Sequence, residues 1–544
     1  MDRRSFLKNS TLVASLPLLP ACGGDGDAGA TDAGATDVGA DGAVGPLPDY
    51  VWQGAPGPES LFSHGVASGD PFTDSVLLWT RITVAGSDLA GKDAPAYWEV
   101  STDETFKDRI AAGETTTSSA RDHTVKVIAG GLQPGTTYFY RFKTQGRTSP
   151  VGRTRTVTAG STDRIRLGFC SCSNYVRGYF IAYRSLAKRN DLDAVLHLGD
   201  YIYESNYTTG VRPHKPEKEV ITLEDYRIRY AHYRTDADLQ EVHRQHPFIC
   251  VWDDHETANN SYKDGAGNHD DDEGAWSDRR EAGTKAWHEW LPVRESDDGR
   301  IWRQHAWGDL VDLYMLDTRL WARAKQTTGA NKAVINDPKR PFLGEDQEKW
   351  LHDGLAGSTA KWKVLGQQVM MGQLTINGAV VNTDQWDGYA PTRDRLFELV
   401  RTKKIDGMVV LTGDIHSSWA IDLVEDSNDP KGYDLKTGKG ALGVEFVVPG
   451  VTSSTFGAGS PGIGKIAVEF NPHIRWSELT QRGYAVLDLQ QDAAQCDWFL
   501  LKDVDKPDIP ETHGASFRTE HGSGHLTQVK EPMASRKGAP KLAT

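Results

Sequence analysis

The chain has 544 residues, with 61 Lys or Arg against 75 Asp or Glu, which gives a formal net charge of −14 at pH 7. This acidic balance excludes a broad nucleic-acid-binding surface, so no nucleic-acid partner is expected. The length predicts one large domain and a smaller one, and no apolar run is long enough to cross a membrane as a helix.

Residues 1–22 are predicted to be an export signal. Arg3-Arg4 is followed by the letters SFLK and then by a short apolar stretch that runs from Leu12 to Ala21. This order is typical of a twin-arginine signal peptide, and the alternative is a chance pair of arginines. We expect the chain to use the twin-arginine export machinery and to be periplasmic, or membrane-anchored and extracellular.

The segment LPAC, which ends at Cys22, resembles a bacterial lipoprotein cleavage box. In such a box Cys22 becomes the lipidated first residue of the mature protein, whereas plain signal cleavage is the alternative. Residues 23–45 are mainly Gly, Ala, Asp and Thr, so they cannot bury a core and are predicted to be a flexible acidic linker. A lipid on Cys22 and this linker would together tether the protein to a membrane.

Residues 46–158 are predicted to form a small β-sandwich. Short alternating runs are separated by turn residues, and the runs are SVLLWTRI, AYWEVS, HTVKVI, TYFYRFKT and RTRTV. The segment LQPGTTYFYRF resembles the end of a fibronectin type III-like module. No chemistry is evident in this part of the chain, so a packing or spacer role is favoured.

Residues 159–510 show a different pattern, in which apolar runs alternate with helical stretches at 181–189, 223–234 and 347–355. This pattern is typical of a layered α/β domain, and residues 511–544 are treated as a C-terminal extension. Polar groups follow five of the predicted strands, which are IRLGF, DAVLHL, PFICVW, DLYML and MVVLT. Ligands bind beyond the carboxyl ends of strands in open α/β sheets, so these polar groups are predicted to share one crevice.

Asp200 and Tyr203 lie in the segment HLGDYIYE, directly after a predicted strand. Gly199 permits a tight turn there, and a carboxylate with two oxygens can bridge two metal ions. Tyr203 is within reach of the same site if the chain turns, and a phenolate suits a ferric ion better than Mg²⁺ or Ca²⁺. Alone, Tyr203 would be interpreted as an aromatic packing residue.

Two further segments supply candidate ligands. In GDIH, Asp414 and His416 are expected to point to one face of an extended chain. In WDDHE, one carboxylate is expected to bind a metal and His255 to contact the substrate, with the other side chains orienting them. An amide oxygen from Asn259 or Asn260 would suit a hard ion such as Ca²⁺.

Cys172 follows the first predicted strand, and its thiolate would bind iron or zinc. A buried structural cysteine and a disulfide between Cys170 and Cys172 are the alternatives. Arg319 in LDTR is a candidate for binding a phosphate oxygen, with internal salt bridging as the alternative.

These segments, in this order, resemble the PhoD-like alkaline phosphatases of the calcineurin-like metallophosphoesterase superfamily. The resemblance covers nearly the whole mature chain through HGVASGDPFTDSVLLWTR, FCSCSN, HLGDYIYE, VWDDHE, LDTR and LTGDIHSSW. It implies a four-layer α/β/β/α metallophosphoesterase domain that holds Fe³⁺ and Ca²⁺, preceded by the β-sandwich. It also implies which residues surround the ions: Cys172, Asp200, Tyr203 and His416 at the iron, Asp200 as the bridge, and Asp254, Asn260 and Asp414 at calcium. His255 matches the substrate-side histidine of the superfamily.

The predicted function is that of an exported alkaline phosphatase, which hydrolyses small phosphate monoesters by a metal-activated oxygen nucleophile. The alternatives are phosphodiesterase or phospholipase D-type activity at the same site, an inactive surface-binding relative, and a zinc hydrolase of another ester. The intact set of candidate ligands disfavours the inactive relative.

Overall fold

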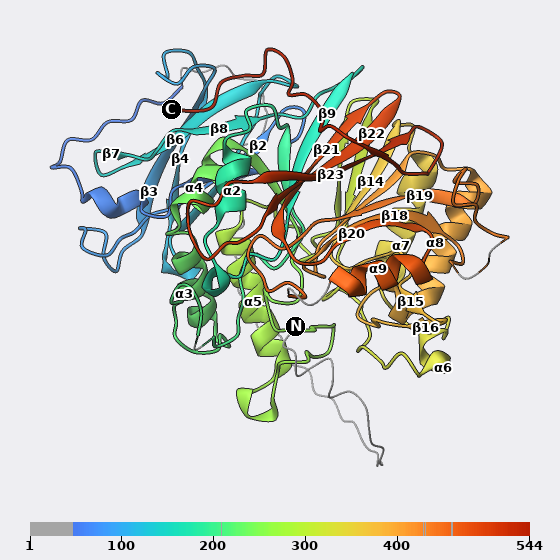
Figure 1. The fold of residues 1–544 in the computed structure, drawn as a ribbon. Coiled ribbons are helices and arrows are strands. Elements are labelled where there is room, and N and C mark those ends of the chain that lie inside the picture. Colours follow the sequence, from blue (N-terminus) through green and yellow to red (C-terminus); the bar gives the residue numbers. More distant parts are fainter. Residues whose placement is uncertain (1–46, 208, 428, 430, 458–460) are drawn as a thin grey trace.

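The computed structural model describes residues 47–544 except 208, 428, 430 and 458–460, so the predicted signal peptide, Cys22 and the whole predicted linker lie outside the described residues. The fold is a mixed α/β fold with two large sheets near its centre (Figure 1). Within the described part of the chain, no helix is long and apolar enough to span a membrane.

The N-terminal strands divide between two sheets that share one apolar core. A five-stranded sheet contains β3 (Ala94–Ser101), β4 (Arg109–Thr117), β6 (Thr137–Thr144), β7 (Arg147–Thr148) and β8 (Gly152–Arg155). The opposing layer consists of β1 (Val66–Gly69), β2 (Val76–Arg81) and β5 (Thr124–Ala129). This second layer is also one edge of the largest sheet, so the N-terminal β part and the following α/β part are joined by backbone hydrogen bonds.

The largest sheet has ten strands in the order β24-β23-β22-β21-β9-β10-β11-β1-β2-β5. Its centre is the parallel set β9 (Arg164–Cys170), β10 (Ala194–His197) and β11 (Pro247–Cys250). Antiparallel strands follow on one side: β21 (Arg482–Gln490), β22 (Ala493–Leu501), β23 (Thr512–Glu520) and β24 (Thr527–Val529). The C-terminal segment from residue 511 therefore contributes two strands to this sheet.

The second large sheet has seven strands, in the order β12-β13-β14-β17-β19-β18-β20. Four of them are parallel: β13 (Val311–Met315), β14 (Trp362–Gln367), β17 (Met408–Thr412) and β19 (Ala441–Val447). The flanking antiparallel strands are β12 (Arg303–Trp307), β18 (Ser418–Val424) and β20 (Ile474–Glu478), and a separate hairpin joins β15 (Thr375–Ile376) to β16 (Ala379–Val380). All five strands predicted to carry polar groups are confirmed, three in the first sheet and two in the second.

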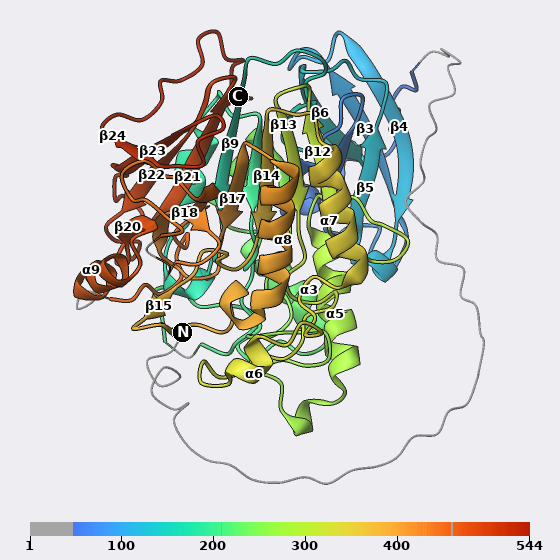
Figure 2. The same ribbon diagram turned by 90° about the vertical axis from the view of Figure 1, so that its right-hand side faces the viewer.

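The two sheets share one apolar core, to which Leu167 and Phe169 of β9 contribute together with Leu313 of β13 and Leu411 of β17. Side chains of four helices extend this core on the side of the first sheet: α2 (Ile181–Ala187), α3 (Leu223–Tyr233), α4 (Ala237–Gln245) and α5 (Trp276–Trp290). Helices α7 (Glu345–Gly357) and α8 (Ala390–Lys403) pack on the second sheet (Figure 2). Helix α9 (Pro461–Phe470) packs at the edge of the second sheet, where Ala467 shares an apolar cluster with Ile421 of β18 and Ile474 of β20. The remaining helix, α6 (Lys332–Ile335), is short. The helices predicted at 181–189, 223–234 and 347–355 are confirmed as α2, α3 and α7.

Candidate metal centre

The polar groups that follow the five strands meet beyond the carboxyl ends of both large sheets. Among the described residues, three groups of side chains place their ligand atoms within 4.8 Å of one another. The groups are Cys172 with Asp200 and His416, then Asp200 with Asp254 and His255, and finally Asp253 with Asp254 and Asp414. Because Asp200 belongs to the first two groups and Asp254 to the last two, the three groups form one continuous cluster.

The first group has a mixed set of donor atoms. Tyr203 joins it, since its hydroxyl lies 2.8 Å from Oδ2 of Asp200 and 3.1 Å from Nε2 of His416. Nδ1 of His416 lies 3.0 Å from the carbonyl oxygen of Ser454, and burial lowers the pKa of this histidine to about 3. A neutral ring that donates from Nδ1 leaves the lone pair of Nε2 directed at the group, as a metal ligand requires.

Five of the predicted metal ligands adopt left-handed backbone conformations, which residues other than glycine rarely adopt. Residues held in such conformations concentrate at functional sites, because the surrounding structure must offset their cost. Their φ angles lie between 53° and 60°, and the residues are Cys172, Asp200, Asn260, Asp414 and His416.

The turn that follows β10 requires a glycine at position 199. The φ of Gly199 is 102°, and a Cβ added there would lie 2.3 Å from Cβ of Asp253. The turn after β10 therefore presses against the turn after β11, and this contact brings Asp200 close to the acidic residues that follow β11.

The extended backbone predicted for residues 414–416 is wrong. Asp414 and His416 both have positive φ, and the amide of Ile415 donates to the carbonyl oxygen of Gly413 at 2.7 Å, which folds the segment into a tight turn. As a result, the two side chains enter different groups: His416 lies beside Cys172, whereas Asp414 lies beside Asp253.

The cluster concentrates negative charge in a poorly hydrated place. Asp200, Asp253 and Asp254 are buried, and Asp414 is partly buried. Burial, together with neighbouring carboxylates, raises the pKa of Asp200, Asp253 and Asp414 well above the ordinary value. A bound cation would relieve this repulsion and hold the acids ionised.

Arg319 supplies the main internal counter-charge. Its guanidinium is fully buried and contacts Asp253 at 2.5 Å, Asp414 at 2.8 Å and Asp384 at 2.9 Å. The internal salt bridging that was the alternative for Arg319 is therefore present. Asp384, which also pairs with Arg323 at 2.5 Å, was not foreseen, because it lies in a loop that follows no predicted strand.

His255 has a partner that the sequence reasoning missed. Its Nδ1 lies 2.6 Å from Oε2 of Glu204, the last residue of HLGDYIYE, and Glu204 is fully buried. Burial opposes a charge on His255, yet Glu204, Asp200 and Asp254 raise its pKa well above the ordinary value. A histidine held protonated in this way is suited to donate a proton. An acidic residue next to the predicted ligands was the available signal.

The remaining candidates are resolved in part. Cys170 and Cys172 are both unpaired, so the predicted alternative of a disulfide between them is wrong. Cys170 belongs to the apolar core, whereas Cys172 lies in the ligand cluster. The backbone amide of Asn260 donates to Oδ2 of Asp254 at 2.6 Å, so Asn260 adjoins the cluster, and its side chain as a ligand remains a prediction.

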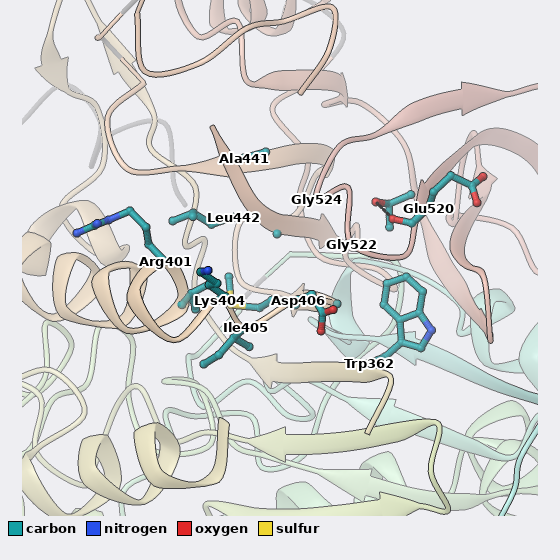
Figure 3. A pocket seen from close by; sticks show the side chains of 15 residues that line it. Trp362, Arg401, Lys404, Ile405, Asp406, Ala441, Leu442, Glu520, Gly522 and Gly524 are labelled. Atoms are coloured by element: carbon teal, nitrogen blue, oxygen red, sulfur yellow. Dashed lines mark hydrogen bonds between the residues drawn. The ribbon is translucent and has the colours of Figure 1, made fainter. Parts of the chain in front are cut away.

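A separate hollow of about 300 Å³ lies at the amino ends of β14 and β17 (Figure 3). Its walls include Trp362, Arg401, Lys404, Asp406 and Gly522. None of the predicted site residues lines it, so the candidate site and this hollow occupy opposite ends of the same strands.

Both parts of the chain are similar to known phosphatases. A family profile described as PhoD-like phosphatase matches residues 167–498, and one for the N-terminal domain of PhoD-like phosphatases matches residues 51–158. Alkaline phosphatase D of Bacillus subtilis (strain 168) is 36% identical in an alignment 490 residues long, which covers 86% of this chain and 82% of that protein. A solved structure of PhoD matches with a TM-score of 0.79 and 34% identity, over 90% of this chain and 95% of that one.

Proposed function

Because the chain belongs to the PhoD-like phosphatase family and is thus a phosphatase, we propose that it is an exported alkaline phosphatase that hydrolyses phosphate monoesters at a centre of Fe³⁺ and Ca²⁺. The observation that carries the proposal is the position of Asp200, which belongs to two adjoining groups of ligands. One carboxylate shared in this way is suited to bridge two ions.

The donor set of the first group supports ferric iron. Burial raises the pKa of both Cys172 and Tyr203 well above their ordinary values, with Asp200 adding to the effect. These groups ligate as anions, so they need a highly charged cation to lose their protons. A thiolate, a phenolate, an imidazole and a carboxylate together suit Fe³⁺ better than Ca²⁺ or Mg²⁺.

The second ion would be held by oxygen atoms alone. Asp200, Asp254 and Asp414 supply carboxylates, and Asn260 supplies an amide oxygen, which is the chemistry that Ca²⁺ prefers. When bound, the two ions supply Lewis-acid stabilisation of the phosphoryl oxygens and activate water for attack. Arg319 would hold Asp253 and Asp414 in place, since its nitrogens already contact their carboxylates. Direct contact between Arg319 and a phosphate oxygen stays a proposal.

His255 would deliver the proton to the leaving oxygen. Glu204 holds Nδ1 of the ring, so the remaining N–H, at Nε2, is available for the substrate. Glu204 also accepts the amide of Asn259 at 2.8 Å and the side-chain amide of Asn268 at 3.2 Å. A carboxylate fixed by three donors keeps the ring in one orientation.

Several finer features belong to the same proposal. We propose that the catalytic part has the four-layer α/β/β/α order, which the core shared by the two sheets and the helices outside them support. The fibronectin type III-like character of the N-terminal sandwich, twin-arginine export and lipidation of Cys22 are proposed from the sequence patterns.

The test is hydrolysis by the purified protein supplied with iron and calcium. A phosphate monoester is compared with a diester over a range of pH, and metal content and the visible spectrum are recorded on the same sample. We expect faster turnover of the monoester than of the diester, and one iron-dependent absorption band. In Asp200→Asn we expect both the hydrolysis of the monoester and the absorption band to be lost. Hydrolysis without bound iron, or none of either ester with the metals present, would contradict the proposal.

A further inference from the structure

Two arginines stand beside the metal centre without a carboxylate partner. Arg177 ends a short 3-10 turn (Tyr175–Arg177) that follows β9, and Arg482 is the first residue of β21. Within the described residues, neither side chain takes part in an ion pair. Nearby arginines differ, since Arg184 pairs with Asp238 at 2.7 Å and Arg212 with Asp236 at 2.5 Å.

Arg482 contacts the predicted ligands through one intervening residue, Ser453. Its Nε donates to the carbonyl oxygen of Ser453 at 3.3 Å, and Oγ of Ser453 lies 2.6 Å from the hydroxyl of Tyr203. The same Oγ lies 2.8 Å from the carbonyl oxygen of Cys172. The terminal nitrogens of Arg482 have no hydrogen-bond partner among the residues described, so they are available to an anion.

The guanidinium of Arg177 lies over an aromatic ring. The central carbon of its guanidinium lies 5.0 Å from the ring centroid of Tyr207, and Tyr207 is close enough to His255 and Glu204 for their charges to affect its pKa. Stacking on a ring fixes the plane of a guanidinium while leaving its N–H groups free for a planar anion.

The two guanidiniums also act on each other. Burial lowers the pKa of Arg482, and the charge of Arg177 lowers it further. Asp503 and Asp505 oppose this effect from nearby, but Asp503 already accepts the amides of Val504 at 2.7 Å and Asp505 at 3.0 Å. Asp505 and Asp503 act on Arg482 more strongly than Arg177 does, yet within the described part of the chain neither carboxylate forms an ion pair with either arginine. Two guanidiniums without a paired carboxylate favour a bound anion.

We propose that Arg177 and Arg482 form a second anion-binding subsite, which holds a second anionic group of the substrate while its phosphoryl group lies at the metal centre. The inference rests on the proposed phosphatase function and narrows its substrates to esters that carry a further phosphate or carboxylate. The fork of a guanidinium binds either group through paired hydrogen bonds. The subsite also explains how a protein with a formal net charge of −14 selects an anionic substrate.

The test uses alkanediol phosphates of matched chain length, in which the far end carries a hydroxyl, a carboxylate or a second phosphate. For the metal-loaded protein, we expect kcat/KM to be about tenfold to a hundredfold higher with the second anion, at one preferred chain length. The carboxylate and phosphate series distinguish the two sources of that anion. No preference at any chain length would overturn the subsite.

Arg177→Gln and Arg482→Gln should each reduce this preference to a few-fold, and Arg177→Lys and Arg482→Lys should restore part of it. Arg401→Gln, at the opposite end of the sheet, removes the same charge and should leave the preference unchanged. Variants that lower kcat/KM for both substrates equally, with iron content retained, would indicate a structural role and overturn the proposal.

Binding separates this inference from the function on which it rests. Non-hydrolysable phosphonate versions of the same compounds are titrated into the metal-loaded protein by calorimetry. If the monophosphate is hydrolysed but the second anion adds no affinity, the subsite fails and the phosphatase proposal stands. If nothing is hydrolysed but the bisphosphonate binds more tightly and Arg177→Gln removes the gain, the proposed function fails and the subsite stands.

Discussion

The two ends of β17 differ in a way that the strand itself does not explain. At the carboxyl end, Asp414 adopts a left-handed conformation and adds a carboxylate to a cluster with few counter-charges. At the amino end, Lys404 adopts the same conformation beside a hollow whose charged groups are exposed or paired, as in Arg401 with Glu425 at 3.0 Å. A hollow and an unusual backbone angle are thus insufficient to identify a site. What distinguishes the carboxyl end is a group of buried carboxylates whose mutual repulsion a bound cation would relieve.

Removing the shared carboxylate should have the largest effect on this contrast. On the proposed arrangement, Asp200→Asn would take a charged ligand from both ions, and losing several kcal/mol of metal-ion stabilisation should lower kcat/KM by at least about a thousandfold. Metal analysis should show depleted iron. Asp406→Asn, the matched change at the amino end of β17, should leave both quantities unchanged. An active, metal-replete Asp200→Asn protein would contradict the bridging role.

His255→Gln should have the next largest effect. It should lower the rate of the chemical step without changing the metal content. Loss of a positioned proton donor lowers kcat by about a hundredfold to ten-thousandfold, with metal content retained. Glu204→Gln should cost about tenfold to a hundredfold, as is usual for a group that orients an essential side chain. The double variant should be no worse than His255→Gln, since Glu204 acts through the ring. Loss of metal in His255→Gln would instead make His255 a ligand.

Tyr203→Phe should have a clear spectroscopic effect and a smaller kinetic one. The change removes the hydroxyl that is proposed to bind iron but keeps the ring, whose centroid lies 4.1 Å from that of His255. We expect the visible absorption band to weaken or shift in the iron-loaded protein. Tyr201→Phe is a suitable control, because Tyr201 is buried against His243 outside the cluster. An unchanged spectrum in Tyr203→Phe would remove Tyr203 from the iron.

The smallest expected effect is at Lys404. Its φ of 54° is costly for a residue with a Cβ, so Lys404→Gly should stabilise the protein by up to about 1 kcal/mol without changing activity. The midpoint of urea unfolding measures the gain. Asp414→Gly relieves the same kind of strain but should reduce activity and calcium content. Equal behaviour of the two variants would remove the distinction between the two ends of the strand.

The sequence predicted the elements of the α/β part well, because buried parallel strands are continuous apolar runs with polar groups at their carboxyl ends. The family resemblance implied two β layers, but the strand pattern did not predict which strands belong to which sheet, nor that β1, β2 and β5 extend the first one. Neighbouring strands in a sheet can be far apart in the sequence. The local pattern of apolar and polar residues does not reveal which strands pair. The capped helix α3 was easier to place, since Thr222 and Asp225 form a capping box within one turn.

Within the site, the residues that were predicted follow strands, and two of those that were missed do not. Asp384 and Ser453 come from loops, where no periodic pattern marks them. Glu204 was overlooked although it adjoins Tyr203, because its role depends on His255 reaching it from another strand. The turn at Asp414 and His416 was wrongly predicted as extended, since the letters that follow a strand do not reveal a left-handed backbone.

Strand β9 cannot pair with β21 until the ribosome has made the residues between them. Phe169 lies opposite Ala485, and closing a loop of this length costs about 5 kcal/mol of chain entropy. A ribosome takes roughly 15 to 60 seconds to make the intervening residues. Until then one edge of β9 has no neighbour, and the thiol of Cys172 has not received Ser453 or its neighbours. The nascent protein therefore passes through a period in which an open strand edge and a reactive sulfur both need protection.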